Sequence, residues 1–294
     1  MINTKRFTKK QTAMMGALIG DAMGVPHEFK HKDNIEPYFI DHPLALTDDY
    51  RSYAHEPSGV YSDDFSQQLC VAVNSIKPTH NKGAFYEDLL EWQRGKYWVN
   101  SHLFDEGIQT ASQLQYYSRT GKVNIHNEQM SGNGSLMRIL PVAFSASNVS
   151  ELKTRVDDFG SITHNSPDCM NSCFFYCLLV KILRLSYIDF NFAWNEVIDQ
   201  MDGWTPQREK HNLGSGYVID TLMAVKDCIE NTNSFPEAIK RAIMYGGDTD
   251  TNACVVGGIA ALVFGLDDVP QEWFDFIQPS LENEYVQQLF GSNG

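Results

Sequence analysis

The amino-acid sequence predicts an all-α protein, folded as one compact multi-helix domain over residues 1–294. Apolar residues recur at helical spacing along almost the whole chain. No convincing run alternates apolar and polar residues in the way that a half-buried strand does. No internal repeat, low-complexity tract or linker rich in proline, glycine and serine divides the chain. We therefore expect a single helical domain.

The first predicted helix, residues 10–24, carries Gly16, Gly20 and Gly24 at intervals of four. Such a stripe along one face predicts a close contact with another helix, because glycine lets two backbones approach each other. Asp21 lies beside this stripe. Its simplest interpretation is a solvated carboxylate.

The later helices are predicted from the same periodicity. Cys169, Cys173 and Cys177 repeat every four residues, which predicts a buried stripe of free thiols and argues against disulfides. Leu222 and Val225 are spaced as a half-buried helix would place them. The helices expected along the chain lie near residues 10–24, 66–78, 83–95, 106–118, 134–147, 149–160, 168–186, 190–201, 214–231, 235–244 and 250–265.

Composition and charge narrow the class of protein. The chain has 294 residues, of which 43% are hydrophobic and 20% charged, as in ordinary globular proteins. Its longest nearly apolar stretch, residues 253–266, is shorter than the roughly 20 residues that a membrane-spanning helix needs. We therefore expect no membrane partner. The formal net charge of −14 argues against nucleic acid as a partner, although a local basic cleft stays open.

The N-terminal residues loosely imitate a signal peptide, because several basic residues precede the apolar run 13–20. Asp21 ends that run, and no convincing small-residue cleavage site follows. We expect a mature N-terminus, a cytoplasmic location and a monomeric protein.

Two acidic clusters stand at expected helix starts. Ser62-Asp63-Asp64 precedes one apolar-periodic segment, and Asp248-Thr249-Asp250-Thr251 precedes another. Aspartate, serine and threonine at a helix start accept hydrogen bonds from the free N–H groups of the first turn. Helix capping is therefore one interpretation of each cluster taken alone.

A second interpretation requires the two clusters to meet, which their spacing alone does not establish. Close carboxylate pairs at 4 Å would repel by about 1 kcal/mol in water and about 4 kcal/mol at an effective dielectric constant of 20. Helix dipoles contribute about 0.3 to 1 kcal/mol each and would not offset several such pairs. Cations would be needed, and oxygen ligands favour Mg²⁺, Mn²⁺ or Ca²⁺ in a two-metal site. Ca²⁺ held purely for stability is an open alternative.

Motifs along nearly the whole chain resemble the ADP-ribosylglycohydrolase family, of the dinitrogenase reductase-activating glycohydrolase type. The pairing of SDD early in the chain with GGDTDT late in the chain is highly specific. The resemblance implies an all-helical fold of that type, two Mg²⁺ or Mn²⁺ ions, and removal of ADP-ribose from proteins or other acceptors. The matching segments are Gly16–Glu28, Tyr61–Asp64, Gly132–Pro141, Thr163–His164, Gly214–Leu222 and Gly246–Gly265.

The resemblance also implies roles for individual residues. Glu28 matches an acidic residue on a mobile loop near the distal ribose, and Asp105 lies where some bacterial members place an acidic residue. With these two, the implied catalytic set includes Asp63, Asp64 and Asp250. The implied metal ligands are Ser62, Asp63, Asp64, Asp248, Asp250 and Thr251. The implied contacts to ADP-ribose are Asn133, Gly134, Ser135, Met137, His164, Gly214, Ser215, Gly216 and Tyr217.

Four positions leave a second interpretation open. Relatives usually carry threonine where this chain has Phe65, which puts rate and substrate preference in question although all six implied ligands are present. Arg138 either clamps a phosphate or extends from a buried helix to pair with a carboxylate, and we do not assign it to catalysis. Taken alone, His164 is typical of a cap or surface histidine, and Tyr217 of a core aromatic with a wet hydroxyl.

The predicted function is a metal-dependent hydrolase that cleaves the bond between the anomeric carbon of the distal ribose and its acceptor. The substrate would be an ADP-ribosylated protein or a small molecule, produced by an ADP-ribosylating enzyme or toxin. Two cations would orient the ribose and lower the pKa of a bridging water, and carboxylates would stabilise an oxocarbenium-like transition state. The alternative is a non-catalytic member that binds ADP-ribose or serves a structural role. The sequence does not select between arginine, serine and nucleobase linkages.

Overall fold

The computed structural model describes residues 4–77, 81–122, 130–185, 188–207 and 209–291. These residues form helices and no β-strand, with two isolated bridges that pair His31 with Gly246 and Gly132 with Tyr217. The predicted all-α class is confirmed. The α-helices are α1 (Lys9–Gly24), α2 (Pro37–Asp41), α3 (Asp63–Ser75), α4 (Lys82–Gln93), α5 (Ile108–Thr120), α6 (Gly134–Arg138), α7 (Val149–Gly160), α8 (Pro167–Leu183), α9 (Phe190–Asp199), α10 (Val218–Glu230), α11 (Phe235–Ile243), α12 (Thr249–Phe264), α13 (Gln271–Phe276), α14 (Gln278–Leu281) and α15 (Glu284–Gly291).

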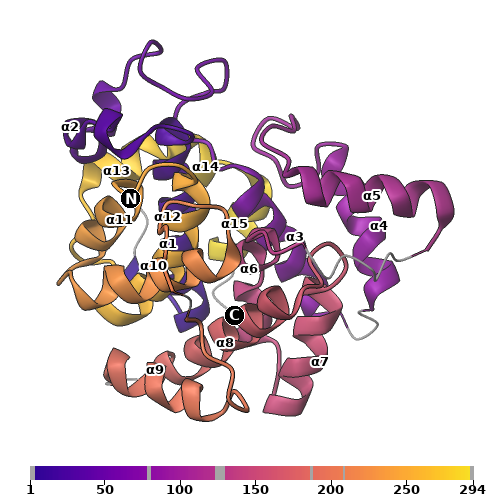
Figure 1. Cartoon of the computed structure of the whole chain (residues 1–294). Helices are drawn as coiled ribbons and strands as arrows, with labels where there is room; N and C mark the ends of the chain where they lie inside the picture. Colours follow the sequence, from indigo (N-terminus) through magenta and orange to yellow (C-terminus); the bar gives the residue numbers. More distant parts are fainter. Residues whose placement is uncertain (1–3, 78–80, 123–129, 186–187, 208, 292–294) are drawn as a thin grey trace.

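Helices α1 and α12 form the centre of the molecule and run antiparallel in direct backbone contact (Figure 1). A Cβ atom added at Gly20 would lie 2.0 Å from the carbonyl oxygen of Ala253, and one added at Gly16 would lie 2.3 Å from that of Gly257. This confirms the close helix contact that the glycine stripe predicts. The Thr249 hydroxyl also donates to the Gly24 carbonyl (2.9 Å), which fixes the first turn of α12 against the last turn of α1.

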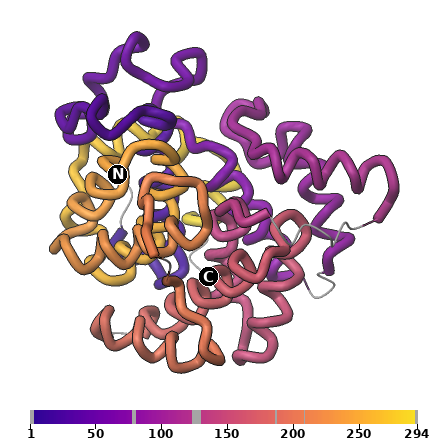
Figure 2. Tube along the Cα trace, viewed as in Figure 1, coloured from indigo at the N-terminus to yellow at the C-terminus, as the bar shows by residue number. Residues whose placement is uncertain are grey.

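The other helices surround this pair and share one hydrophobic core. Helices α8, α10 and α11 pack on α12, while α3 and α6 pack on each other beside the pair. Helices α4 and α5 extend to one side, and the segment between α1 and α3 rises over one end of the pair (Figures 1 and 2). Residues far apart in the sequence are thereby held at the N-terminal end of α12.

The structure differs from the predicted helices in a few places. The helix expected at 134–147 divides into α6 and a 3-10 turn, Leu140–Phe144, because Pro141 has no N–H for a continuous helix. The helix expected from 214 begins at Val218 instead, and the glycines before it form a loop. The short helices α2, α13, α14 and α15 were not predicted. The expected helix ends at 78 and 186 lie outside the described residues.

All six cysteines are free and buried, which confirms the predicted thiol stripe on α8. Among the residues that the structure describes, no helix is both long enough and apolar enough to cross a membrane.

Candidate metal centre and active site

The first acidic cluster forms the start of α3 and docks on α1. Ser62 caps the helix, since its hydroxyl oxygen accepts from the Asp64 N–H (3.3 Å). Asp21 is fully buried, and its carboxylate accepts from the N–H groups of Ser62 (2.9 Å) and Phe65 (2.8 Å). The interpretation of Asp21 as a solvated carboxylate is wrong. The free N–H groups of a buried helix start need an acceptor, and α1 supplies it.

The second acidic cluster forms the start of α12 and is held by two glycine-containing loops. The Asp248 N–H donates to the carbonyl of Gly214 (3.0 Å), and the Asp248 carboxylate accepts from Nδ2 of Asn133 (2.8 Å). Gly247 has a φ of +69°, and a Cβ atom there would lie 2.1 Å from the Gly214 carbonyl oxygen. Only glycine fits that turn, which presents the acidic side chains to α3.

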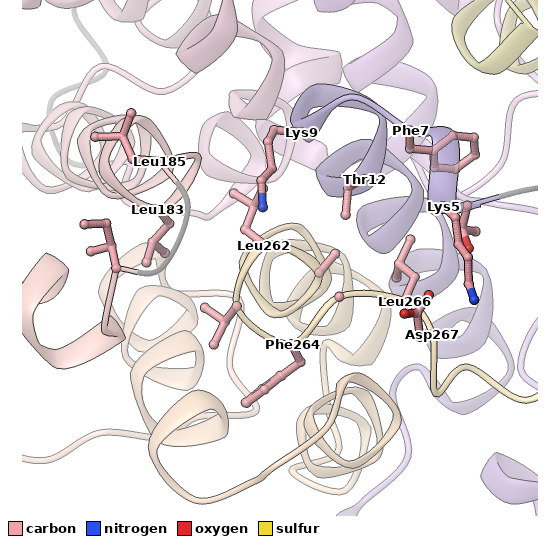
Figure 3. A pocket seen from close by; sticks show the side chains of 15 residues that line it. Lys5, Phe7, Lys9, Thr12, Leu183, Leu185, Leu262, Phe264, Leu266 and Asp267 are labelled. Atoms are coloured by element: carbon pink, nitrogen blue, oxygen red, sulfur yellow. The ribbon is translucent and has the colours of Figure 1, made fainter.

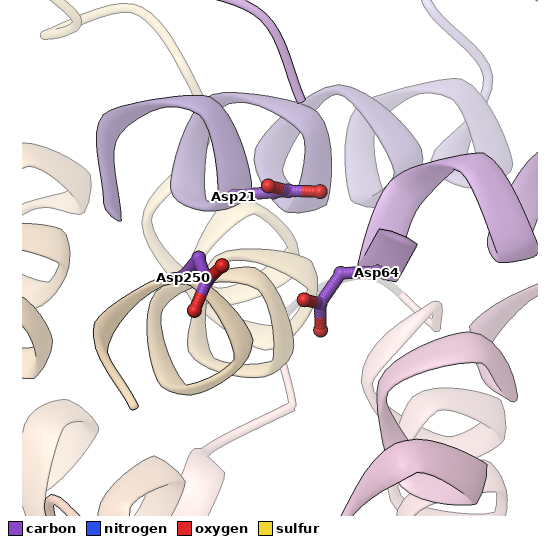
Figure 4. Close-up of side chains that lie close together, drawn as sticks. All are labelled: Asp21, Asp64 and Asp250. Atoms are coloured by element: carbon purple, nitrogen blue, oxygen red, sulfur yellow. The ribbon is translucent and has the colours of Figure 1, made fainter. Parts of the chain in front are cut away.

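The two clusters meet in the interior. The Thr251 hydroxyl donates to Oδ2 of Asp64 (3.2 Å), although 187 positions separate these residues. Carboxylate oxygens of Asp21, Asp64 and Asp250 lie within 4.8 Å of one another (Figure 4). A second group within the same limit consists of Glu28, Asp248 and Asp250. Because Asp250 belongs to both groups, the acidic centre has two adjoining subsites.

Asp63 lies at the edge of this acidic centre. It is buried at the start of α3, and its carboxylate accepts from Nε2 of Gln67 (3.1 Å). Asp21, Asp64, Asp105 and Glu28 all act electrostatically on it. Asp63 therefore belongs to the same negatively charged region, although it is in neither group of three carboxylates.

Glu28 and Asp105 reach the acidic centre from loops outside the central helices. Glu28 follows the 3-10 turn Val25–His27 after α1, and the Ser52 hydroxyl donates to its carbonyl oxygen (2.5 Å). Asp105 precedes α5, accepts from the Tyr53 hydroxyl (2.6 Å) and lies against the carboxyl groups of Glu28 and Asp250. The structure thus brings both predicted acidic residues to the same centre.

Burial makes the ionised state of these carboxyl groups unfavourable. For Asp63, Asp64 and Asp250, burial raises the pKa well above its ordinary value, and neighbouring carboxylates raise it further. Burial raises the pKa of Glu28 to about 9, with added repulsion from Asp105 and Asp248. It also raises the pKa of Asp105 to about 6, although the Tyr53 hydroxyl lowers it. Without a cation, the acidic centre resists holding its full negative charge.

Several oxygen atoms of the acidic centre lack a hydrogen-bond partner. Among the described residues, this is true of Glu28 Oε2, Asp64 Oδ1 and Asp250 Oδ2, which are all buried. A buried acceptor without a donor costs about 1 to 3 kcal/mol and calls for an explanation. The side-chain atoms that could bind a metal ion here are all oxygens, which suits a hard divalent cation.

The residues expected to contact ADP-ribose border the acidic centre on the α6 side. Asn133 Nδ2 donates to Asp248 and to the Thr221 hydroxyl (2.9 Å), so this amide also orients a predicted metal ligand. A Cβ atom at Gly216 would lie 3.1 Å from Asp248 Oδ2, which shows how closely that loop approaches. The Tyr217 hydroxyl donates to Asp168 (2.6 Å) at the start of α8. Ser135 and Met137 of α6 are buried next to this border.

His164 is neither a helix cap nor a surface residue, as it would be if taken alone; it is a buried side chain whose ring lies beneath the α6 loop. A Cβ atom at Gly134 would lie 2.7 Å from its Cε1. The Thr163 hydroxyl accepts from Arg138 Nη2 (2.6 Å) and is 2.7 Å from His164 Nδ1. Thr163 therefore engages Nδ1, and Nε2 is the ring nitrogen that lies nearest the α6 loop.

Phe65 and Ser66 both face away from the acidic centre. The Phe65 ring is fully buried and packs edge-on against Tyr61, with ring centroids 5.4 Å apart. The Ser66 hydroxyl donates to the Asp63 carbonyl (3.1 Å) and accepts from Trp92 Nε1 (2.7 Å). Phe65 is therefore a core residue beside the centre, and Ser66 does not extend into it.

A separate cavity lies at the other end of α12. Its volume is about 480 Å³, and its lining includes Lys5, Lys9, Leu183, Leu262 and Asp267 (Figure 3). At about 1.5 Å per residue, the 16-residue helix places this cavity far from Asp250. No acidic group of three carboxylates lines it among the described residues. The candidate site is therefore at the N-terminal end of α12.

Sequence reasoning missed three residues that support the acidic centre. Asp21 lies between Gly20 and Gly24, whose spacing indicates helix packing and does not reveal what the carboxylate binds. Gln67, which donates to Asp63, lies one helical turn after it. Tyr53 holds Asp105 from a loop with no recognisable pattern.

The structure thus combines an all-helical fold with a buried, oxygen-rich centre that could hold divalent cations. The sequence model of the ADP-ribosylglycohydrolase family matches residues 3–292, and the chain belongs to that family. This confirms the resemblance seen in the motifs and the predicted enzyme class, a glycosidase-type hydrolase.

Individual relatives agree with this assignment. The chain is 28% identical to the ADP-ribosylarginine hydrolase Tri1 of Serratia proteamaculans (strain 568), over 96% of this chain and 79% of that protein. It is 24% identical to the ADP-ribosyl-(dinitrogen reductase) glycohydrolase of Rhodospirillum rubrum, over 94% and 92% of the two chains. A solved structure described as an ADP-ribosylglycohydrolase-related protein complex has a TM-score of 0.78 at 22% identity, over 96% and 95% of the two chains. That last similarity concerns the fold.

Proposed function

We propose that this protein removes ADP-ribose from an arginine side chain of a protein acceptor, with two Mg²⁺ or Mn²⁺ ions bound in the acidic centre. The observation that carries the proposal is the pair of carboxylate groups that share Asp250. Relatives named for ADP-ribosylarginine hydrolysis match nearly the full length of this chain, which supports arginine as the acceptor.

The side chains fit two hard cations. Ser62, Asp63, Asp64, Asp248, Asp250 and Thr251 would hold them, and all six offer oxygen. The unpartnered oxygens of Asp64 and Asp250 are the ones that cations would satisfy. Bound cations would neutralise the carboxylates, orient the ribose hydroxyls and make a water molecule more acidic.

Glu28 and Asp105 are the proposed proton carriers. Their carboxyl groups lie against each other, so the pair can share one proton and pass it on. One member takes a proton from the attacking water, and the other supplies a proton to the departing guanidine. Tyr53 holds Asp105 in position through its hydroxyl.

The diphosphate of ADP-ribose would bind on the α6 side. The N–H groups of Gly134 and Ser135 in the first turn of α6 offer donors without added charge, whereas the Asn133 N–H already donates to the Gly216 carbonyl (3.0 Å). His164 would add its Nε2–H from beneath the same turn, because Thr163 occupies Nδ1. This arrangement places donors at the phosphates and carboxylates at the ribose, where positive charge develops during cleavage.

The free thiols favour a reducing compartment. All six cysteines are buried and unpaired. Proteins of oxidising compartments commonly pair theirs. We therefore include a cytoplasmic location in the proposal.

The test is a panel of ADP-ribose conjugates linked through arginine, serine or a nucleic acid, each incubated with the protein and Mn²⁺ or with EDTA. We expect release of ADP-ribose from the arginine conjugate, and its loss in EDTA. Asp250→Asn should lower the rate by at least about a thousandfold and weaken Mn²⁺ binding. Asp267→Asn, at an exposed position beyond the other end of α12, is the matched control and should keep full activity.

Other outcomes would redirect the proposal. Binding of ADP-ribose without release from any conjugate would identify a non-catalytic member of the family. Release from the serine conjugate alone would retain the hydrolase and reject arginine. Full activity of Asp250→Asn would remove the acidic centre from the mechanism.

A further inference from the structure

Three residues beside the acidic centre have positive φ although none is glycine. They are Phe29 (61°), Tyr53 (52°) and Asp105 (55°). This backbone region costs bulky residues free energy, and such residues concentrate at functional sites. The three side chains also form a row. The ring centroids of Phe29 and Tyr53 are 6.2 Å apart, and the Tyr53 hydroxyl donates to Asp105.

The backbone of Phe29 is fixed to the turn that carries the acidic residues. Its N–H donates to the carbonyl of Gly247 (2.7 Å), and the N–H of Gly247 donates to the carbonyl of Lys30 (2.8 Å). Phe29 is thus joined directly to the residue before Asp248. The strained conformation is held by the site itself.

The Phe29 side chain is 73% exposed, so neither core packing nor burial explains the ring. It follows Glu28, whose carboxyl group is in the acidic centre. The adjacent cation does not cover the ring, because Lys30 Nζ lies over the ring of Tyr50 instead (4.5 Å). An aromatic face is therefore held at the outer edge of the site, on the side of Glu28 and Asp105.

We propose that Phe29 is a specificity-determining residue whose ring stacks on the guanidinium of an ADP-ribosylated arginine acceptor. This inference rests on the proposed function, in which Glu28 and Asp105 exchange protons with the attacking water and the departing acceptor. A guanidinium is planar, cationic and weakly hydrated, and it stacks well on aromatic rings. The surrounding carboxylates attract the same cation. A serine acceptor has neither the plane nor the charge.

The experiment compares the metal-loaded wild type with Phe29→Gly and Phe29→Trp, using free ADP-ribosylarginine as substrate. Phe29→Gly should raise KM about 3- to 30-fold with kcat nearly unchanged, because the stacking contact exists in the ground state. Phe29→Trp keeps an aromatic ring at this position and should retain the wild-type KM. Glycine also accepts positive φ, so the melting temperature of Phe29→Gly should stay within about 2 °C of wild type.

Two further measurements separate this role from others. The affinity for free ADP-ribose should be unchanged in Phe29→Gly, since ADP-ribose has no acceptor. Leu44→Gly, a control at another exposed apolar side chain of the same segment, should leave KM unchanged.

An unchanged KM in Phe29→Gly would overturn the inference, and so would equal weakening of ADP-ribose binding, which would mean that the ring stacks on the adenine base. These results differ from failure of the proposed function. In that case the wild type itself would not hydrolyse the arginine conjugate.

Discussion

Two buried charged regions of this protein lie on neighbouring elements and differ in how fully their charged groups are hydrogen-bonded. Arg138 of α6 is fully buried, and its guanidinium donates five hydrogen bonds. The acceptors are neutral oxygens of Gln67, Gly134, Phe159, Gly160 and Thr163. The acidic centre has buried carboxylates with oxygens that no group of the described chain satisfies.

The difference shows which charge the fold alone can hold. Arg138 needs nothing from outside and ties α6 to α3 and α7, so the alternatives of a phosphate clamp or a carboxylate partner are not what the contacts show. The acidic centre is complete only with added positive charge. A buried charge that is fully hydrogen-bonded indicates a structural role, whereas one with open positions indicates a ligand.

The largest expected effect on stability follows from removing Arg138, the charge whose hydrogen bonds are all made within the protein. Arg138→Met leaves several buried oxygens without donors, and we expect the free energy of unfolding to fall by about 4 kcal/mol. Denaturant unfolding measures it. Arg94→Met, at an exposed arginine paired with Glu91, should change stability by less than about 0.5 kcal/mol. A loss of similar size in both variants would contradict the comparison.

Phe65, like Arg138, makes all its contacts within the protein and should matter for stability. Phe65→Thr removes a fully buried ring that packs on Tyr61, so the free energy of unfolding should fall by about 3 kcal/mol. KM should stay at the wild-type value, because the ring does not face the site. Phe65→Leu should lose only about 1 kcal/mol. A changed substrate preference in the folded Phe65→Thr protein would show that this position shapes the site.

The acidic centre, whose oxygens lack partners, should instead make the stability of the protein depend on metal. Mn²⁺ at about a hundred times its dissociation constant should stabilise the wild type by about 2.7 kcal/mol. Asp64→Asn should lose most of that stabilisation, yet in EDTA it should be at least as stable as wild type, because one buried carboxylate is gone. Thermal unfolding with and without Mn²⁺ decides this. A marked loss of stability in EDTA would mean that Asp64 is structural.

Chelation alone also tests whether the cations serve only stability. Catalytic cations should leave with a modest fall in melting temperature, while a purely structural Ca²⁺ site predicts unfolding in EDTA. Mn²⁺ and Ca²⁺ additions to the chelated protein distinguish the two cases by activity.

The smallest expected effect is a pH dependence of the metal-free protein. Burial raises the pKa of Glu28 to about 9, so its proton stabilises the fold at low pH and that stabilisation is lost as pH rises toward 9. Between pH 6.5 and 8.5 we expect the free energy of unfolding to fall by about 2.5 kcal/mol, and by less in Glu28→Gln. This window avoids His27, whose pKa burial lowers to about 3 and which acts in the opposite direction below pH 6.5. A rise in stability across the window would contradict the sign.

The sequence was enough to predict the helical class, a close contact of α1 with another helix, and both acidic helix starts. Their meeting was an assumption at that level, because a separation of 187 positions carries no distance. Asp21 was misjudged since an isolated aspartate in a helix is usually solvated, and only the docking of α3 reveals the N–H groups that it accepts. The role of Tyr53 could not be predicted for a similar reason, because its hydrogen bond to Asp105 depends on where two loops meet.

The distance across the acidic centre is set by main-chain contact. A Cβ atom at Gly24 would lie 2.4 Å from the Cα of Asp250, and the two backbones stay equally close at Gly20 and Gly16. A larger residue at Gly16, Gly20 or Gly24 would therefore force the two helices apart and change the spacing of the carboxylates. The acidic and aromatic residues supplied from outside this pair, Glu28, Tyr53 and Asp105, lie instead in the segments 28–57 and 101–107. Relatives that process different acceptors are thus expected to diverge there first.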